Sequence, residues 1–149
     1  MSLEQTITSA LKEAMKAKDQ AALRGIRAVK AAILLAKTDG TGKGLDSAGE
    51  IRLLQKLVKQ RQDSLDIYEK QGREDLAVVE REEIEVIQRF LPTQMDESAL
   101  TSLIEGVIGD TGASGMKDMG KVMGIVSQKV AGQADGKTVA AIVKQLLNR

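Results

Sequence analysis

Apolar residues recur at spacings of three and four along almost the whole chain, which is the period of amphipathic helices. A first stripe runs from Leu3 to Ala14 and a second from Ala22 to Ala36. Asp19 stands just before the second stripe, where its carboxylate can accept backbone N–H groups as an N-cap. The pattern therefore predicts two helices in this part of the chain.

Residues 38–44 then break the pattern with three glycines. Within it, residues 40–44 have a superficial likeness to a phosphate-binding loop, but Lys43 is followed by Gly44 where such a loop needs Ser or Thr. A helix, rather than the required strand, is also expected before it. We therefore interpret this segment as a flexible connection between helices.

A third helix is predicted to begin at a capping box formed by Ser47 and Glu50. Its apolar stripe continues from Ile51 to Tyr68, and Arg61 occupies one position of that stripe. A fourth helix is predicted over residues 73–90. Its predicted apolar face consists of Leu76, Val79, Ile87 and Phe90.

Glu83 falls on the apolar stripe of the fourth helix, as Arg61 does on the third. We predict that Arg61 pairs with Glu83 or Glu80 as a structural ion pair that fixes the register of two antiparallel helices. Glu80 and Glu83 share a face and could instead contribute to a divalent-cation site. Runs of glutamate are more often solvated helix surface, so no metal site is expected.

Pro92, the only proline, ends the fourth helix because the residue before a proline avoids the helical region. This point divides the chain into a predicted N-terminal helical part, residues 1–92, and a smaller C-terminal part, residues 93–149. Three further helices are predicted in the second part, the first capped by Asp96 and the last by Asp135. The predicted fold is all-α, with about seven helices and no β-sheet.

Gly120 and Gly124 lie inside the sixth predicted helix, where each glycine costs about 1 kcal/mol relative to alanine. Glycines four apart share a face and let another backbone approach closely. Close packing of a neighbouring helix is the favoured interpretation, and contact with the phosphate backbone of a ligand stays open. The nearby Met116, Met119 and Met123 are expected to fill the core.

Cysteine and histidine are both absent, which excludes disulfides, thiolate nucleophiles, imidazole bases and the usual zinc ligands. The N-terminal segment carries Glu4, Lys12 and Glu13 and has no uninterrupted apolar run. It is therefore expected to be neither a signal peptide nor a membrane span. On these grounds we expect a cytoplasmic protein without a cofactor.

The net charge is +1, but its distribution along the chain is uneven. Residues 1–37 hold seven basic and three acidic residues (net +4), and residues 38–113 hold nine and sixteen (net −7). Residues 114–149 hold six and two, again a net of +4. Basic ends leave room for a polyanion partner, although a solvated charge pattern without a partner explains them equally well.

Lysines recur in the last two predicted helices, and Lys117 and Lys121 are spaced to share one helix face. Such lysines could neutralise phosphates. The chain has one Phe, one Tyr and no Trp, so it has no stacking platform for single-stranded bases. Any contact with RNA would be made to its backbone and shape.

Several segments, taken together and in order, resemble the YqeY proteins, a family similar to the tail region of the B subunit (GatB) of the tRNA-dependent amidotransferase. The segments that carry the resemblance are residues 23–30, 59–64, Tyr68 with Gly72 and Arg73, Glu80 with Glu83, and residues 90–92, 117–123 and 134–137. The resemblance implies an all-α fold with a three-helix C-terminal part. It also implies tRNA, or the amidotransferase or synthetase machinery that handles aminoacyl-tRNA, as the partner to test.

The same resemblance indicates Lys117, Gly120, Lys121, Lys129 and Lys137 as candidate nucleic-acid-binding residues. One departure stands at the corner before the last helix, where this chain has Ala131-Gly132-Gln133 and the family pattern has two basic residues. The carbon–nitrogen ligase chemistry of the larger enzyme belongs to another domain, so no independent catalytic activity and no catalytic residue are expected here.

Three functions stay open at this point. The first is a tRNA-associated accessory module, and the second is a protein-interaction module that docks on aminoacyl-tRNA handling complexes through the acidic middle segment. The third is an autonomous amide ligase, which the absence of a nucleotide-binding loop and of a His or Cys base disfavours.

Overall fold

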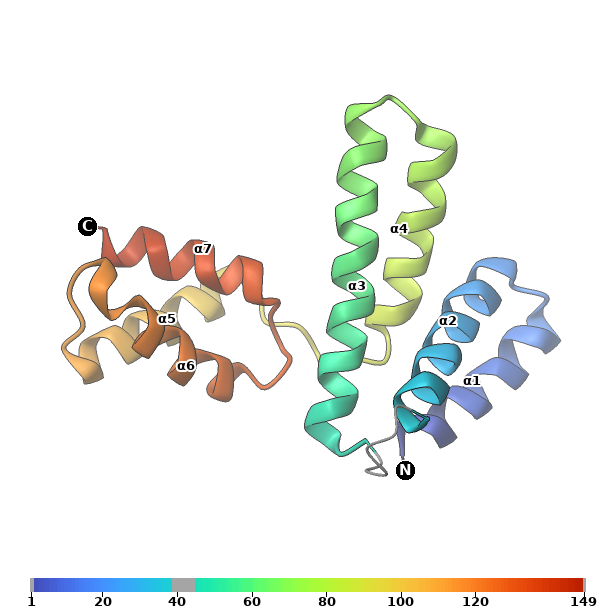
Figure 1. The fold of residues 1–149 in the computed structure, drawn as a ribbon, viewed down its shortest axis with the longest axis horizontal. Helices are drawn as coiled ribbons and strands as arrows, with labels where there is room; N and C mark the ends of the chain where they lie inside the picture. The colour runs from blue at the N-terminus through green and yellow to red at the C-terminus, as the bar shows by residue number, and fades with distance from the viewer. Residues whose placement is uncertain (1, 39–44, 149) are drawn as a thin grey trace. The chain divides into compact units, whose positions relative to one another are not determined.

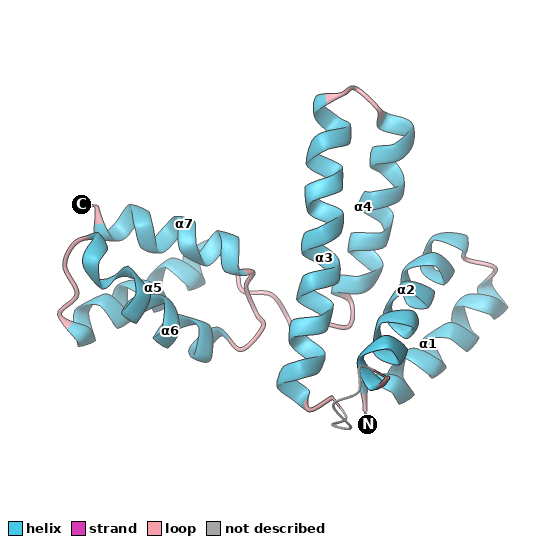
Figure 2. Cartoon of the chain, viewed as in Figure 1, coloured by secondary structure: helices cyan, strands magenta, loops and turns pink. Residues whose placement is uncertain are grey.

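The computed structural model describes residues 2–38 and 45–148, and every regular element in these residues is a helix. Seven α-helices and one short 3-10 helix follow one another in this part of the chain, without a strand among them (Figure 2). The predicted all-α fold is confirmed. The chain divides into two units, Met1–Leu91 and Pro92–Arg149, one residue before the predicted division. The proposed glycine connection at 40–44 lies outside the described residues.

Unit 1 consists of two helical hairpins (Figure 1). The first hairpin pairs α1 (Leu3–Ala17) with α2 (Gln20–Lys37), and the second pairs α3 (Ser47–Lys70) with α4 (Glu74–Gln88). Their shared core is aliphatic, as a chain with so few aromatic residues requires. Its fully buried members include Ile7, Val29, Leu54 and Ile87.

Aspartate caps begin most of the longer helices. Asp19 accepts the Ala22 N–H over 3.0 Å at the start of α2, as predicted. The predicted capping box at the start of α3 is wrong, because the N-cap is Asp46, whose carboxylate accepts the Gly49 N–H over 2.7 Å. The Asp46 side chain occupies the capping position one residue earlier, so Ser47 is already the first residue of the helix.

The buried face of α4 is broader than the sequence pattern indicates. Ala77, Ile84 and Val86 are buried beside the predicted Ile87, whereas the predicted Leu76, Val79 and Phe90 are only partly buried. The reason is that α4 packs against two helices, α3 on one side and α2 on another. A single stripe of spacing three and four describes only one such contact.

Gly25 of α2 lies directly against Val86 of α4. A β-carbon built on Gly25 would stand 2.7 Å from Val86 Cγ1, closer than packed carbon atoms approach one another. Glycine at this position therefore allows α2 and α4 to pack closely here.

Unit 2 is a three-helix arrangement of α5 (Glu97–Thr111), α6 (Met119–Val130) and α7 (Gly136–Leu147), with the short 3-10 helix η1 (Met116–Asp118) before α6 (Figure 1). Asp96 caps α5 and Asp135 caps α7, both as predicted. The side chains of Leu100, Ile104, Val126 and Val143 are among those that form its core.

Two sequence expectations in unit 2 need correction. The sixth helix does not begin at Met116, because residues 116–118 form the separate 3-10 turn. Met119 and Met123 pack against the core of the unit, but Met116 is 42% exposed and does not fill it. Its position on η1 takes it out of the α-helical period that places the other two methionines inward.

Candidate functional site

The candidate lysines of unit 2 are all on the surface. Lys117 lies on η1, Lys121 in the first turn of α6, Lys129 in its last turn, and Lys137 at the start of α7. Each of the four is exposed, and none forms an ion pair with a described residue. Their charges are therefore available to an external anion.

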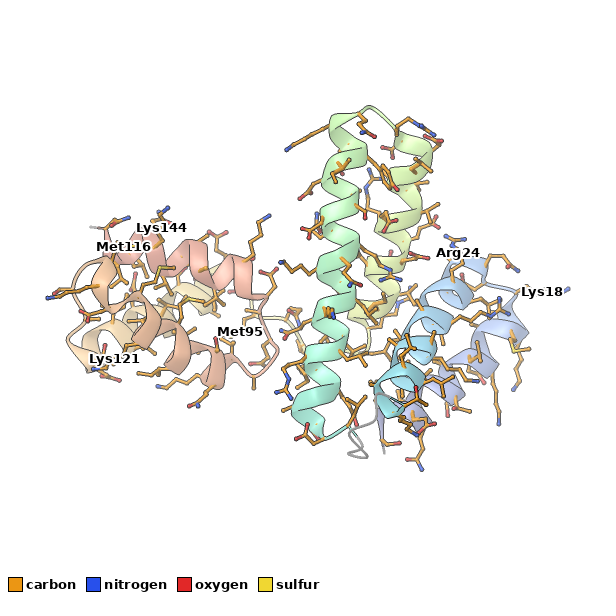
Figure 3. The ribbon with its side chains drawn as sticks, viewed as in Figure 1. Lys18, Arg24, Met95, Met116, Lys121 and Lys144 are labelled. Carbon is orange, nitrogen blue, oxygen red and sulfur yellow. The ribbon has the colours of Figure 1, made fainter. Side chains whose placement is uncertain are left out.

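The helical period places Lys121 and Lys129 on different sides of α6. Lys121 lies beside Gly124 and Gln128 on the exposed face of α6, by the spacing of three and four. Lys129 follows Ile125 and Val122 at spacings of four and three, and both of those side chains pack in the core of the unit. Lys129 therefore projects from a different side of α6 than Lys121 does. Figure 3 shows Lys121 at a different edge of unit 2 from Lys144 of α7.

Lys117 and Lys121 do not lie on one continuous α-helix, which the predicted shared face required. The prediction assumed one continuous α-helix through both residues, whereas η1 ends at Asp118 and α6 begins at Met119. Because Lys117 lies in the 3-10 turn and Lys121 in the α-helix, the α-helical period alone does not relate their positions.

Gly120 and Gly124 face open space. A β-carbon added at either position would meet no atom within 4 Å, and both residues are exposed. The favoured interpretation, close packing of a neighbouring helix, is therefore wrong. The reason is that Val122, Val126 and Val130 carry the contact with the core, which leaves the glycines on the opposite side of α6.

The exposed face of α6 therefore carries small and polar residues. Gly120, Gly124 and Ser127 follow one another at spacings of four and three, with Lys121 and Gln128 beside them. A ligand can approach the helix backbone here without displacing a bulky side chain. Unit 2 is not basic as a whole, since residues 92–149 hold six basic and six acidic residues.

In unit 1, ionic contacts converge on Glu83 of α4. Arg61 Nε of α3 lies 3.1 Å from Glu83 Oε2, so Glu83 is the partner of Arg61 among the two, Glu83 and Glu80, that the sequence left open. Arg24 Nε of α2 lies 4.0 Å from Glu83 Oε1, and Arg24 Nη2 donates to Glu82 over 2.5 Å. The cluster therefore links three helices, and the buried Arg24 Nε donates no hydrogen bond.

Glu80 stands next to this cluster without joining it. No hydrogen bond or ion pair to its side chain is formed within the described part of the chain. Burial raises the pKa of Glu80, the negative charge of Glu83 raises it further, and Arg61 partly opposes the shift. Its environment thus favours the neutral carboxyl group.

Arginines also neutralise the carboxylates at the far end of the α3–α4 hairpin. Arg81 donates to Glu74 over 2.7 Å and to Glu69 over 3.4 Å, and the first hydrogen bond lowers the pKa of Glu74. Arg73 donates to Asp75 over 2.9 Å and lowers the pKa of that carboxyl group in the same way. These contacts reduce the negative field of the acidic segment.

No group of three or more acidic side chains in the described residues is placed to hold a metal ion. None of the helices in residues 2–38 and 45–148 is both long and apolar enough to cross a bilayer.

Sequence reasoning missed two of these residues. Arg24 is separated from Glu82 by 58 positions, and no periodicity connects positions that far apart. Gly25 could have been found from the sequence, because a glycine inside a long helix lowers helix stability, and close packing against a neighbour is one explanation for keeping it. The same signal was applied to Gly120 and Gly124, where packing does not supply the reason.

Comparison with known proteins gives a family match over nearly the whole chain. The family model described as Yqey-like protein matches residues 4–147. A relative from Pyrenophora tritici-repentis, named Altered inheritance of mitochondria protein 41, mitochondrial, is 30% identical over 141 residues, which cover 92% of this chain and 76% of that protein.

Proteins of the same name from Lachancea thermotolerans and Eremothecium gossypii are 40% and 38% identical over 81 residues. Each of these matches covers 54% of this chain but only 43% and 44% of the relatives, so the matched part is less than half of their length.

These relatives contradict the cytoplasmic location expected from the sequence, because they are named as mitochondrial proteins. The expectation rested on the lack of a recognisable signal peptide or membrane span. Neither feature distinguishes the cytoplasm from an organelle interior, so the inference was unsound. The match over residues 4–147 and the similarity to these relatives show that the chain belongs to the YqeY family.

Proposed function

We propose that this chain is a tRNA-associated helical module without catalytic activity of its own, and that it contacts RNA through unit 2. The observation that carries the proposal is the exposed face of α6, where Lys121 has no ionic partner among the described residues and Gly120 and Gly124 have no packing neighbour. This face offers charge and close backbone approach in one place.

Glycine in a helix lowers stability, so an exposed glycine pair needs a reason other than packing. A phosphate backbone that lies close to α6 would supply one, because a β-carbon at Gly120 or Gly124 would hold it away. Lys121 on this face, together with any other exposed lysine of unit 2 that the RNA reaches, would neutralise phosphates and release counterions. With no aromatic residue between positions 92 and 149, base stacking cannot contribute.

The choice of tRNA rests on the resemblance of the YqeY family to the tail of the amidotransferase B subunit. That tail is an appendage that helps to hold the tRNA body, which is a folded duplex with an accessible backbone. The same resemblance supports a role beside the amidotransferase machinery and supplies no catalytic group for this chain.

The alternative of docking through the acidic middle segment has weaker support. Six carboxylates of α3 and α4 are engaged in ion pairs with arginines of unit 1. These are Glu69, Glu74, Asp75, Glu82, Glu83 and Glu85. A basic partner would have to compete with internal arginines for them, which lowers the gain from such docking.

The test is titration of the full chain into fluorescein-labelled tRNA, with a DNA duplex of equal charge as the control, at several salt concentrations. We expect saturable binding that prefers tRNA. With two to four phosphates neutralised, the slope of log K against log salt concentration should be about −2 to −4. Lys121→Ala should reduce that slope by about 1. Absence of binding at low salt would refute the proposal.

A further inference from the structure

The C-terminal half of α2 exposes two adjacent leucines. Leu34 is 63% and Leu35 is 71% exposed, the two highest values for large apolar side chains in the described residues. Covering an exposed leucine removes apolar surface from water, which favours association. A pair of leucines on one helix end is therefore a favourable contact point for a partner.

Leu34 also forms one wall of a groove between α1 and α2. Ile7 and Ile33 lie at its base, Thr8 lies on the α1 side, and Lys30 and Lys37 lie at its edge. Its apolar lining and small size suit one large apolar side chain. A helix that inserts such a side chain would also cover Leu35 with a neighbouring turn.

The charges around the groove are mainly positive. Lys30 and the nearby Arg27 on α2 have no ionic partner within the described residues, and Lys37 pairs with Glu4 across the groove. Residues 1–37 carry seven basic and three acidic residues, a net of +4. A partner that fits this surface has apolar side chains flanked by carboxylates.

We propose that the α1–α2 groove is a docking site for an acidic amphipathic helix of a partner protein. Its apolar face would cover Leu34 and Leu35, and its carboxylates would reach Lys30 and Arg27. RNA fits this surface poorly because exposed leucines offer nothing to phosphates. A flat lipid surface does not fill a groove, and the acidic helix of a second copy, α4, already has Glu74, Glu82 and Glu85 paired with arginines.

The test uses the full chain and a fluorescein-labelled peptide of about five helical turns, with leucines at spacings of three and four and glutamates elsewhere. A matched peptide has lysine in place of every glutamate. We expect saturable binding of the acidic peptide only, weakened about tenfold or more by Leu34→Ala/Leu35→Ala and by Lys30→Glu. Ile67→Ala in the last turn of α3 is the matched control, since Ile67 is 53% exposed and does not line the groove, and it should leave binding unchanged.

Several outcomes would overturn this inference. They are no saturable binding of the acidic peptide, equal binding of both peptides, and equal loss of binding in the Ile67→Ala control. A further pair of outcomes would assign the surface to another occupant, provided that peptide binding is unchanged in Leu34→Ala/Leu35→Ala. If this variant loses binding to anionic phosphatidylglycerol vesicles, the surface belongs to lipid. If it loses dimerisation in sedimentation, the surface belongs to a second copy. The leucine variant should retain its tRNA affinity, so this result is separate from the RNA proposal.

Discussion

Arg61 Nε of α3 lies 3.1 Å from Glu83 Oε2 of α4, and the two side chains are only 17% and 16% exposed. Such a shielded pair helps to specify the register between the two helices, since sliding α3 by a turn would separate Arg61 from Glu83. Whether the pair also adds stability depends on how much desolvation its contacts offset. Arg24 adds a second, longer contact to the same carboxylate.

Removing one member of the pair should be more damaging than removing both. We expect Arg61→Ala to lower the free energy of unfolding by about 1–3 kcal/mol, because Glu83 is left partly buried with only the distant Arg24. The combined variant Arg61→Met/Glu83→Leu should lose less than the single variant. Urea denaturation of the three proteins measures this, and a single-variant loss below about 0.5 kcal/mol would contradict it.

Glycine-to-alanine substitutions should have opposite effects in the two units. Gly25→Ala should destabilise the chain by about 1–2 kcal/mol, since the added methyl group meets Val86 and must push the helices apart. Gly124→Ala should stabilise it by up to about 1 kcal/mol, because the methyl group enters open space on a helix. Thermal denaturation with both variants side by side checks the two signs, and two changes of the same sign would contradict the packing described.

Glu80 should make stability depend on pH in a recognisable way. The pKa of Glu80 is raised in the folded state, so the folded chain binds the Glu80 proton more tightly than the unfolded chain does. Ionisation of Glu80 therefore lowers the stability of the fold as the pH rises through this raised pKa. Glu80→Gln should therefore raise the melting temperature at pH 7. The advantage should shrink as the pH falls through the ordinary glutamate pKa of about 4.3, where Glu80 itself becomes neutral. An advantage that is constant with pH would show that charge is not its cause.

Much of the fold could be predicted because helical periodicity and capping are local. Asp19, Asp96 and Asp135 begin helices where the pattern placed them, and Arg61 was identified as a stripe position that needs a partner. Residue spacing carries this information because the helical repeat and the caps are formed by residues close together in the sequence, whatever packs around them. The start of α3 was misplaced by one residue because Asp46 and Ser47 are both good caps.

The rest depends on contacts between distant segments. Spacing alone could not show that α4 has two packing neighbours, that Arg24 reaches Glu82, or that Gly25 lies against Val86. Nor could it distinguish a glycine that admits a neighbouring helix from one that faces solvent. Gly25 and Gly124 look alike in sequence, and the structure separates them.

The most direct test of the RNA proposal measures tRNA affinity and unfolding free energy together for Gly120→Ala/Gly124→Ala. If the glycines keep α6 open for a phosphate backbone, the variant should be more stable than the parent chain and yet bind tRNA about tenfold or more weakly. Each methyl group strengthens the helix and blocks the approach at once. A variant that gains stability and binds tRNA with undiminished affinity would contradict the proposal that RNA lies on this face of unit 2.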